Sequence, residues 1–456
     1  MDMRNEFKFG SYGFYNRKIL FFVSLLFMVL SVFSCVVSGL GRISPFVLGT
    51  TDNVVSTETE LVNVVNNVAE SAIIILNKDI TLIESLVIPV DKNITLTSNN
   101  NAKFYKLIGA NGKATITVNG ILALKGIIVT HRTESSGRGV TINTGGKFVM
   151  ISGEVSGNSD VIGGGVYVYY GMFDMSGGMI TNNIAVTNER EDSAQTMEQH
   201  SSGNKQHSGV ISANSASSMG GGVYVGYDSS FSMSGGVISN NEAALDGGGV
   251  YVDVAGSISM TGESVIANNK AVRHGGGVYA NGGSFRIAGR AVIVNNTATH
   301  RGGGINIKAG PFSMGGGLIA NNTAGTGGGV YMSLGSLSTM YRGEISGNIA
   351  IGTMEVSGGG GVYNEGNFAM SGGVITNNTA YNFGGGVYNN DNFKLSGEGK
   401  IYDNTALRGD NIYHYNRYNV ERYIIPISSV GIVMSIVVSL CLYLRKKPKK
   451  NKHTQH

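Results

Sequence analysis

Short apolar runs alternate with glycine and polar corners along most of this chain. Between residues 71 and 129 the runs read Ala-Ile-Ile-Ile-Leu, Ile-Thr-Leu, Leu-Val-Ile, Ile-Thr-Leu, Ile-Thr-Val and Leu-Ala-Leu, with Asn, Asp and Gly between them. Short β-branched and aliphatic runs bounded by turn residues are typical of β-strands. The pattern predicts many short strands joined by tight turns.

From residue 163 onward the pattern becomes an internal repeat. The apolar residue that follows the glycines recurs at intervals of 25 to 32 residues from Val223 onward. A variant, Gly302-Gly-Gly-Ile-Asn306, and a decayed copy, Asp410-Asn-Ile-Tyr413, fit the same series. The motif Gly-Gly-Gly-Val-Tyr starts at Gly163, Gly220, Gly247, Gly275, Gly327, Gly359 and Gly384.

Two further motifs complete each unit. The first reads Phe231-Ser-Met-Ser-Gly-Gly-Val-Ile238, and the second is Asn-Asn-x-Ala, as at Asn240. Looser copies of the first begin at Ile258, Phe285, Leu337 and Phe393. The second occurs at Asn182, Asn240, Asn268, Asn295, Asn321 and Asn377, with half-copies at Asn348 and Asn404.

This three-part unit predicts one coil of an all-β, parallel β-helix solenoid. Residues at i and i+2, such as Phe231 and Met233, point to one face of a strand, so they and Ile238 should face inward. Glycines suit the corners, and stacked Asn side chains can form a hydrogen-bonded ladder. Roughly 13 coils between residues 70 and 420 would make a rod of roughly 60 Å. An antiparallel sandwich or a propeller is the alternative.

Residues 56–69 predict a short helix that caps the first open edge of the solenoid. An insertion, residues 187–208, breaks the repeat and predicts a polar loop. The expected organisation is a signal peptide or signal anchor at 1–41, a cap at 42–69, and the solenoid at 70–420. A transmembrane helix at 423–444 and a basic tail at 445–456 follow.

Two apolar runs and the charge distribution predict the membrane topology. Residues 19–40 follow Arg17-Lys18 and resemble a secretory signal or a retained helix, whereas residues 424–444 are long enough to span a bilayer. Six Lys and Arg residues follow Leu444, and residues 1–18 carry a net charge of +2, so the rest carries −4 of the total of +4. Basic residues stay on the cytoplasmic side. A cell-surface, single-pass plasma-membrane protein with a cytoplasmic C-terminus follows, and nucleic acid is not an expected partner.

The repeats resemble those of the chlamydial-type polymorphic outer-membrane proteins and of adhesin-like β-helix proteins. Ile238-Ser-Asn-Asn241 is similar to their Phe-x-x-Asn motif, and Gly247-Gly-Gly-Val250 is similar to their Gly-Gly-Ala-Ile motif. The resemblance covers roughly residues 145–415 and implies a right-handed helix and an adhesive rod at the cell surface. The chlamydial proteins end in a membrane barrel, whereas this chain ends in a single apolar run, so the secretion route does not carry over.

No residue pattern predicts catalysis, a metal site or a cofactor. Asp246 and Asp253 flank one glycine turn and could approach each other as a hydrolytic pair, although solvated turn residues are the simpler interpretation. The histidines share no metal-ligand spacing and are interpreted as solvated surface residues; they are His131, His200, His207, His274 and His300.

Two features are candidates for ligand binding. If Val faces the core, each Tyr of the glycine motif points outward, and an exposed tyrosine ladder could stack sugars or anchor a protein partner. The alternative is that the tyrosines stabilise the stack itself, and Asn306 interrupts the series. The ladder comprises Tyr167, Tyr224, Tyr251, Tyr279, Tyr331, Tyr363 and Tyr388, with Tyr413 in the decayed copy. The candidate binding loop carries Glu189, Arg190, Glu191, Asp192, Glu198, His200, Lys205 and His207.

Four sites match the N-glycan acceptor pattern. Asn93 is expected to be accessible, whereas Asn295, Asn321 and Asn377 are expected to be hidden in the asparagine ladder. The sequence therefore predicts an adhesin that binds an extracellular glycan or protein. A passive structural or shielding coat and a polysaccharide-active enzyme are the alternatives.

Overall fold

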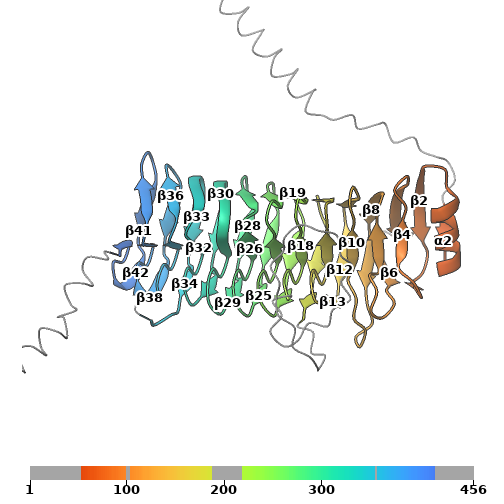
Figure 1. Cartoon of the computed structure of the whole chain (residues 1–456), viewed down its shortest axis with the longest axis horizontal. Coiled ribbons are helices and arrows are strands. Elements are labelled where there is room, and N and C mark those ends of the chain that lie inside the picture. Colours follow the sequence, from red (N-terminus) through yellow and green to blue (C-terminus); the bar gives the residue numbers. More distant parts are fainter. Residues whose placement is uncertain (1–52, 99–102, 187–217, 355–356, 416–456) are drawn as a thin grey trace, which may run out of the picture. The chain divides into compact units, whose positions relative to one another are not determined.

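The computed structural model describes residues 53–98, 103–186, 218–354 and 357–415. These residues coil into a parallel β-solenoid of about 12 turns, in which each strand pairs with strands of the neighbouring coils (Figure 1). The pairings between named strands are all parallel, as in Val223↔Val250 and Phe231↔Ile258. The predicted all-β parallel solenoid is confirmed, and the antiparallel sandwich is wrong.

Four strand ladders run along the solenoid, and each is named after its residues. The VY ladder holds the Val-Tyr motif, the FM ladder holds Phe-x-Met, the VI ladder holds Val-Ile, and the NA ladder holds the end of Asn-Asn-x-Ala. The long strand β30 (Ile305–Ala320) contributes to the first three ladders, and β33 (Ser336–Ser346) contributes to two of them.

The other strands of the VY ladder are β4 (Leu86–Ile88), β7 (Ile116–Val118), β10 (Val140–Ile142), β14 (Val166–Val168), β18 (Val223–Val225), β22 (Val250–Val252), β26 (Val278–Asn281), β32 (Val330–Met332), β35 (Val362–Asn364), β39 (Val387–Asn389) and β43 (Ile412–His414). Those of the FM ladder are β1 (Asn53–Val55), β2 (Ser71–Leu76), β5 (Asn93–Ser98), β8 (Ile121–Lys125), β11 (Lys147–Met150), β15 (Met172–Met175), β19 (Ser230–Met233), β23 (Ser257–Met260), β27 (Ser284–Ile287), β36 (Asn367–Met370) and β40 (Asn392–Leu395).

Those of the VI ladder are β3 (Ile80–Thr81), β6 (Tyr105–Ile108), β9 (Ile127–Thr130), β12 (Gly153–Ser156), β16 (Met179–Thr181), β20 (Val237–Ser239), β24 (Val265–Ala267), β28 (Val292–Val294), β37 (Val374–Thr376) and β41 (Lys400–Tyr402). The NA ladder comprises β13 (Ser159–Asp160), β17 (Ile184–Ala185), β21 (Glu242–Ala243), β25 (Lys270–Ala271), β29 (Thr297–Ala298), β31 (Thr323–Ala324), β34 (Ile349–Ala350), β38 (Thr379–Phe383) and β42 (Thr405–Arg408).

The core is a set of stacked apolar side chains, as the i, i+2 pattern predicts. Phe231, Met233 and Ile238 are buried, and the Phe231 ring stacks on that of Phe173 with centroids 4.6 Å apart. Because every coil repeats the same inward positions, each core side chain meets its counterpart above and below. This repetition lets a chain without cysteines in the repeat region bury a continuous apolar core.

One copy of the Phe motif is out of the predicted register. Leu337 is 60% exposed, and Ser338 occupies the inward position between Phe312 and Phe368. Met340 keeps the inward methionine position, and only a residue two places before it can share that face of the strand. The assignment of Leu337 to the phenylalanine position is therefore wrong.

The glycine triplet is required by geometry at all three positions. In the copy that begins at Gly247, this first glycine has φ of 71°, in the left-handed region. A Cβ on Gly248 or Gly249 would lie closer than 3.0 Å to main-chain oxygens of the next coil. One glycine therefore provides a backbone conformation that other residues rarely adopt, and two allow close contact between coils.

The two ends of the solenoid differ. The predicted cap is present as α2 (Glu58–Asn67), which begins after Thr57 and covers the first coil with Leu61 and Val65. Strand pairing begins ahead of it, because β1 already pairs with β2. At the other end of the described coils the last FM strand is less buried: Leu395 is 43% exposed, whereas its counterpart Met370 is fully buried.

In the described part of the chain, α2 is the sole helix, and no helix has the length and apolar character needed to cross a bilayer. The predicted signal segment at 1–41, the predicted transmembrane helix at 423–444 and the basic tail at 445–456 lie outside the described residues.

Candidate functional site

The tyrosines of the VY ladder form stacks along the outside of the sheet. Val223 and Val225 point into the core, so Tyr224 between them points away from it. Its ring is nearly coplanar with that of Tyr251, with an interplanar angle of 4° and centroids 5.1 Å apart. The other neighbouring pairs are Tyr167–Tyr224 (5.3 Å), Tyr251–Tyr279 (5.2 Å), Tyr331–Tyr363 (5.0 Å), Tyr363–Tyr388 (4.4 Å) and Tyr388–Tyr413 (5.4 Å).

These tyrosines are mostly buried although they point away from the core. Tyr331 and Tyr388 are 1% exposed, and Tyr167 and Tyr224 are half-buried. Tyr251, Tyr279 and Tyr363 are also buried. The expectation of an exposed ladder that stacks sugars is therefore wrong for the five buried tyrosines, because neighbouring rings cover their faces. The geometry supports the alternative, in which the tyrosines stabilise the stack.

Asn306 divides the tyrosines into two stacks. It is buried and pairs in register with Tyr279 on one side and Tyr331 on the other. The guanidinium of Arg301 lies over the Tyr331 ring, 4.9 Å from its centroid, and thus covers the face that a tyrosine at position 306 would have covered. A guanidinium over an aromatic face is a favourable cation–π contact.

Burial raises the pKa of the stacked tyrosines, and neighbouring carboxylates raise it further. The hydroxyl of Tyr224 donates to Asp253 Oδ2 at 2.7 Å, and that of Tyr331 donates to Glu365 Oε2 at 2.5 Å. For Tyr224 and Tyr331, desolvation is the largest cause, and the carboxylate partner adds to it. These hydroxyls therefore stay neutral hydrogen-bond donors over the whole physiological pH range.

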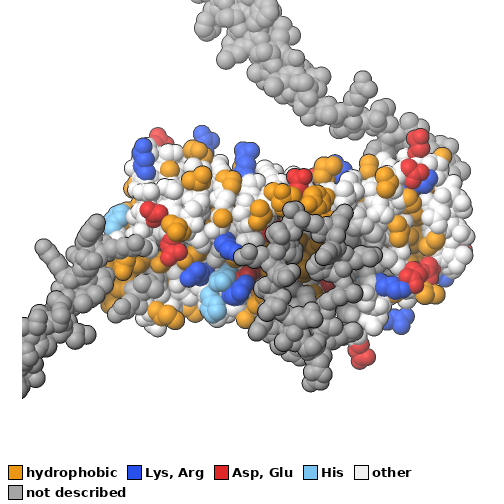
Figure 2. All heavy atoms as spheres, in the orientation of Figure 1, with side chains coloured by type: hydrophobic (Ala, Val, Ile, Leu, Met, Phe, Trp, Pro, Cys, Tyr) orange, Lys and Arg blue, Asp and Glu red, His pale blue; other side chains and the backbone are white. Residues whose placement is uncertain are grey.

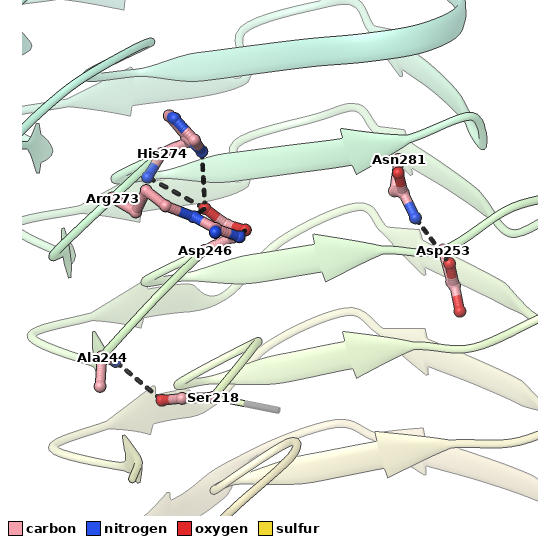
Figure 3. Close-up of polar contacts among 7 residues, drawn as sticks. All are labelled: Ser218, Ala244, Asp246, Asp253, Arg273, His274 and Asn281. Atoms are coloured by element: carbon pink, nitrogen blue, oxygen red, sulfur yellow. Dashed lines mark hydrogen bonds and ion pairs between the residues drawn. The ribbon is translucent and has the colours of Figure 1, made fainter. Parts of the chain in front are cut away.

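Asp246 and Asp253 do not form a pair (Figure 3). Asp246, in the turn before β22, accepts from the main chain of His274 at 3.1 Å, lies 2.9 Å from its Nδ1 atom and pairs with Arg273. Asp253 follows the other end of β22 and accepts from Asn281 at 3.1 Å. Burial would raise the pKa of Asp246, but the hydrogen bonds from His274 and Arg273 lower it overall. The two carboxylates thus serve separate structural contacts, which is incompatible with the hydrolytic pair.

Three other tyrosines form an exposed cluster that sequence reasoning missed. Tyr169, Tyr170 and Tyr227 are 44%, 38% and 49% exposed. The Tyr169 and Tyr170 rings meet edge to face at 4.7 Å, and the Tyr170 and Tyr227 rings lie 5.7 Å apart. Tyr169 also contacts Tyr167, at 6.3 Å, so the cluster adjoins the first tyrosine stack. The available signal was the double tyrosine that directly follows a Val-Tyr-Val strand.

The backbone at Tyr170 is strained. Its φ is 49°, in the left-handed region, and the in-register positions of the neighbouring coils hold Gly145 and Asp228. Glycine and Asp tolerate this conformation better than a bulky aromatic residue, for which it costs roughly 1–2 kcal/mol. Residues with such backbone strain cluster at functional sites.

The candidate binding loop lies outside the described residues. The loop, residues 187–208, lies in the sequence between Val186 and Ser218, and therefore between the coil of Tyr170 and the coil of Tyr227. Its charged residues are the eight named from the sequence: Glu189, Arg190, Glu191, Asp192, Glu198, His200, Lys205 and His207. The chain therefore inserts this segment between the two coils that carry the exposed tyrosine cluster.

A groove of about 850 Å³ lies beside the second tyrosine stack. Arg301 and Glu365 give it charge, His300 also lines it, and Met354 and Ile351 give it an apolar wall. In Figure 2, basic and histidine side chains gather over the coils of β29 and β32. Its volume falls within the range of small-molecule sites. The sequence signal for this groove, which sequence reasoning missed, was the residue before the glycine triplet, here Arg301.

The asparagine ladder is confirmed, and its residues are the second Asn of each motif. Each side chain donates to the next ladder residue, as Asn241 does to Asn269 at 3.0 Å. The ladder is buried and runs through Asn158, Asn183, Asn241, Asn269, Asn296, Asn322, Asn348, Asn378 and Asn404. At its ends lie His131, whose Nδ1 is 2.8 Å from Asn158 Oδ1, and Asn411, which accepts from Asn404 at 3.1 Å.

Two predictions about accessibility are corrected by this ladder. His131 is buried at the ladder end, not solvated, and His274 is half-buried against Asp246, whereas His300 is exposed as predicted. His200 and His207 lie outside the described residues. The glycan-acceptor residues Asn295, Asn321 and Asn377 are the first Asn of the motif and are exposed, not hidden. They occupy left-handed corners, such as φ of 57° at Asn295, which turn the side chain out of the ladder.

Comparisons with known proteins give no further identification. Neither the protein-family models, nor the curated proteins, nor the solved structures contain a match to this chain. The resemblance of the repeats to polymorphic outer-membrane proteins therefore stays a prediction.

Proposed function

We propose that this chain is a cell-surface adhesin that binds an extracellular glycan or protein through the exposed tyrosine cluster. The solenoid would be right-handed, as the resemblance of its repeats implies. One apolar span at 423–444 would anchor it in the plasma membrane with the basic tail in the cytoplasm, and residues 1–41 would direct its export.

The observation that carries the proposal is the cluster of Tyr169, Tyr170 and Tyr227. Their rings are more than a third exposed, unlike those of the buried stacks. Tyrosine combines an apolar ring with a hydroxyl at low entropic cost, and it is enriched at recognition surfaces. The strained backbone of Tyr170 supports a binding role, because a glycine would fit the same corner without strain.

Binding of the full-length chain in lipid nanodiscs to glycans, matrix proteins and cells tests the proposal. The variants are Tyr170→Gly and the double variant Tyr169→Ser/Tyr227→Ser. Each lost aromatic contact is expected to weaken binding by up to about tenfold. Tyr341→Ser is the matched control, because Tyr341 is 55% exposed and lies on β33, outside the cluster. Binding that survives both cluster variants would refute a role for this surface.

A passive structural or shielding rod is the second candidate. It is supported by the side-chain stacks, which repeat from coil to coil and favour a stiff rod whatever it binds. A well-folded chain that binds none of the glycans, proteins or cells would favour this second function.

A further inference from the structure

An arginine lies over the first ring of each of the two tyrosine stacks, and the two arginines differ in their ion-pair partners. Arg138 lies 4.5 Å from the Tyr167 ring centroid, pairs with Asp160 at 3.4 Å and donates to the Ile162 carbonyl at 2.9 Å. Arg301 lies over Tyr331 in the same manner. Within the described ranges, however, Arg301 has no carboxylate at salt-bridge distance.

The surroundings of Arg301 leave its charge available to a ligand. Arg273, one coil away, is already neutralised by the buried Asp246, which also holds His274. Arg301 itself is exposed and lines the groove beside the second stack, next to the exposed His300. Its guanidinium packs over the Tyr331 ring, and a planar guanidinium binds carboxylate or sulfate oxygens in pairs.

We propose that this groove binds a short acidic saccharide, with the carboxylate or sulfate of one sugar on Arg301. The hydroxyl of Thr326 and the amide of Asn390 line the groove and can exchange hydrogen bonds with sugar hydroxyls. Met354 is 77% exposed and offers an apolar surface to a sugar ring face. Glu365, on the same wall as Tyr331, disfavours a ligand that carries charge along its whole length.

The groove is better suited to a saccharide than to an acidic peptide. An extended peptide gains affinity by pairing its main chain with a free sheet edge. The groove instead lies against strands whose edges are occupied, since β32 pairs with β30 and with β35. Side chains therefore provide its contacts, and side-chain hydroxyls, amides and one arginine match the groups of an acidic sugar.

The proposal does not depend on the tyrosine cluster and has its own test. Full-length protein in nanodiscs is titrated with neutral, carboxylated and sulfated oligosaccharides and with oligoglutamate. The wild type should bind acidic sugars and not the neutral ones. Arg301→Gln should weaken that binding at least tenfold and reduce its dependence on salt. Arg290→Gln is the matched control, because Arg290 is an exposed arginine of another surface.

The outcomes separate the alternatives. Preference for carboxylated or for sulfated sugars identifies the acidic group, and either result supports the proposal. Absence of acidic-sugar binding, binding unchanged by Arg301→Gln, or tighter binding of oligoglutamate would overturn it. Tyr170→Gly, which tests the adhesive cluster, should leave acidic-sugar binding intact, so failure of one proposal is distinguishable from failure of the other. Thermal unfolding of Arg301→Gln serves as the folding check.

Discussion

The side-chain amide of Asn269 donates to Oδ1 of Asn296 at 3.0 Å, and the same oxygen accepts the main-chain N–H of Asn269 at 2.9 Å. Asn269 also donates to the Ile238 carbonyl, and its own oxygen accepts two bonds from Asn241. Both donors and both acceptor sites of the buried amide are therefore used. Each coil is thus joined to its neighbours by side chains as well as by strands.

Asn296→Ala should destabilise the solenoid strongly. The variant takes away the acceptor of the buried main-chain N–H and side-chain amide of Asn269, and it removes the side-chain bonds from residue 296 to Asn322 Oδ1 and to the Ile266 carbonyl. Each such group costs roughly 1–3 kcal/mol, so a loss of about 3 kcal/mol or more is expected. The measurement is the denaturant midpoint for unfolding.

The adjacent Asn295 provides the control for that variant. It is exposed and has φ of 57°, so Asn295→Gly should leave the midpoint nearly unchanged. A comparable loss in both variants would show that the corner, and not the ladder, provides the stability.

The buried tyrosines should make the protein sensitive to alkali. Burial raises the pKa of Tyr251 and Tyr363 above the ordinary value of 10.0. In the unfolded chain these tyrosines are exposed and ionise near pH 10. Their contribution to stability is therefore complete below about pH 10 and declines as the pH rises above it. Tyrosinate absorbance followed together with circular dichroism should show their ionisation coincide with unfolding. Reversible titration near pH 10 in the folded state would contradict this expectation.

Asp246 should contribute stability that acid removes. Burial acts to raise its pKa, but the bonds from His274 and Arg273 hold it below the ordinary value of 3.8. A lowered pKa stabilises the folded state at pH values above about 3.8. This stabilisation is lost as the pH falls through the folded-state pKa of Asp246. Asp246→Asn should cost about 2 kcal/mol at neutral pH, with the difference from the wild type shrinking in acid.

Glu263→Gln is the matched control for that variant. Glu263 pairs with Arg290 at 2.9 Å, but both side chains are largely exposed, so its loss should have little effect. Acid-unfolding curves of the two variants and the wild type make the comparison. Equal losses of stability in the two variants would show that burial of the ion pair of Asp246 does not contribute to the stability of the fold.

Ser338 is a weak point of the core. It occupies a phenylalanine position, and its hydroxyl is buried without a hydrogen-bond partner. Ser338→Ala removes that hydroxyl and should be neutral or stabilising by about 1 kcal/mol. Leu337→Ser should be neutral, because Leu337 is exposed. Thermal unfolding is the measurement, and a large loss in the Leu337 variant would restore the register predicted from the sequence.

The internal repeat made it possible to predict the fold from the sequence. Each coil must place the same residues inward, so Phe231, Met233 and Ile238 recur at fixed intervals and identify the core directly. The glycine triplets mark the same corner in every coil, and the paired Asn residues mark the ladder. Local periodicity and turn chemistry decided these features, because stacking of coils applies one constraint many times.

Exposure of the tyrosines and the arrangement of the two candidate sites were decided by the tertiary structure alone. The sequence places Tyr251 and Tyr170 equally well on an outer face, but ring stacking buries the first and leaves the second exposed. Asp246 and Asp253 are close in sequence, yet opposite ends of one strand separate them. Arg301 reaches Tyr331 from another coil. Such contacts depend on which side chains the stacking of coils brings together, and no single repeat contains that information.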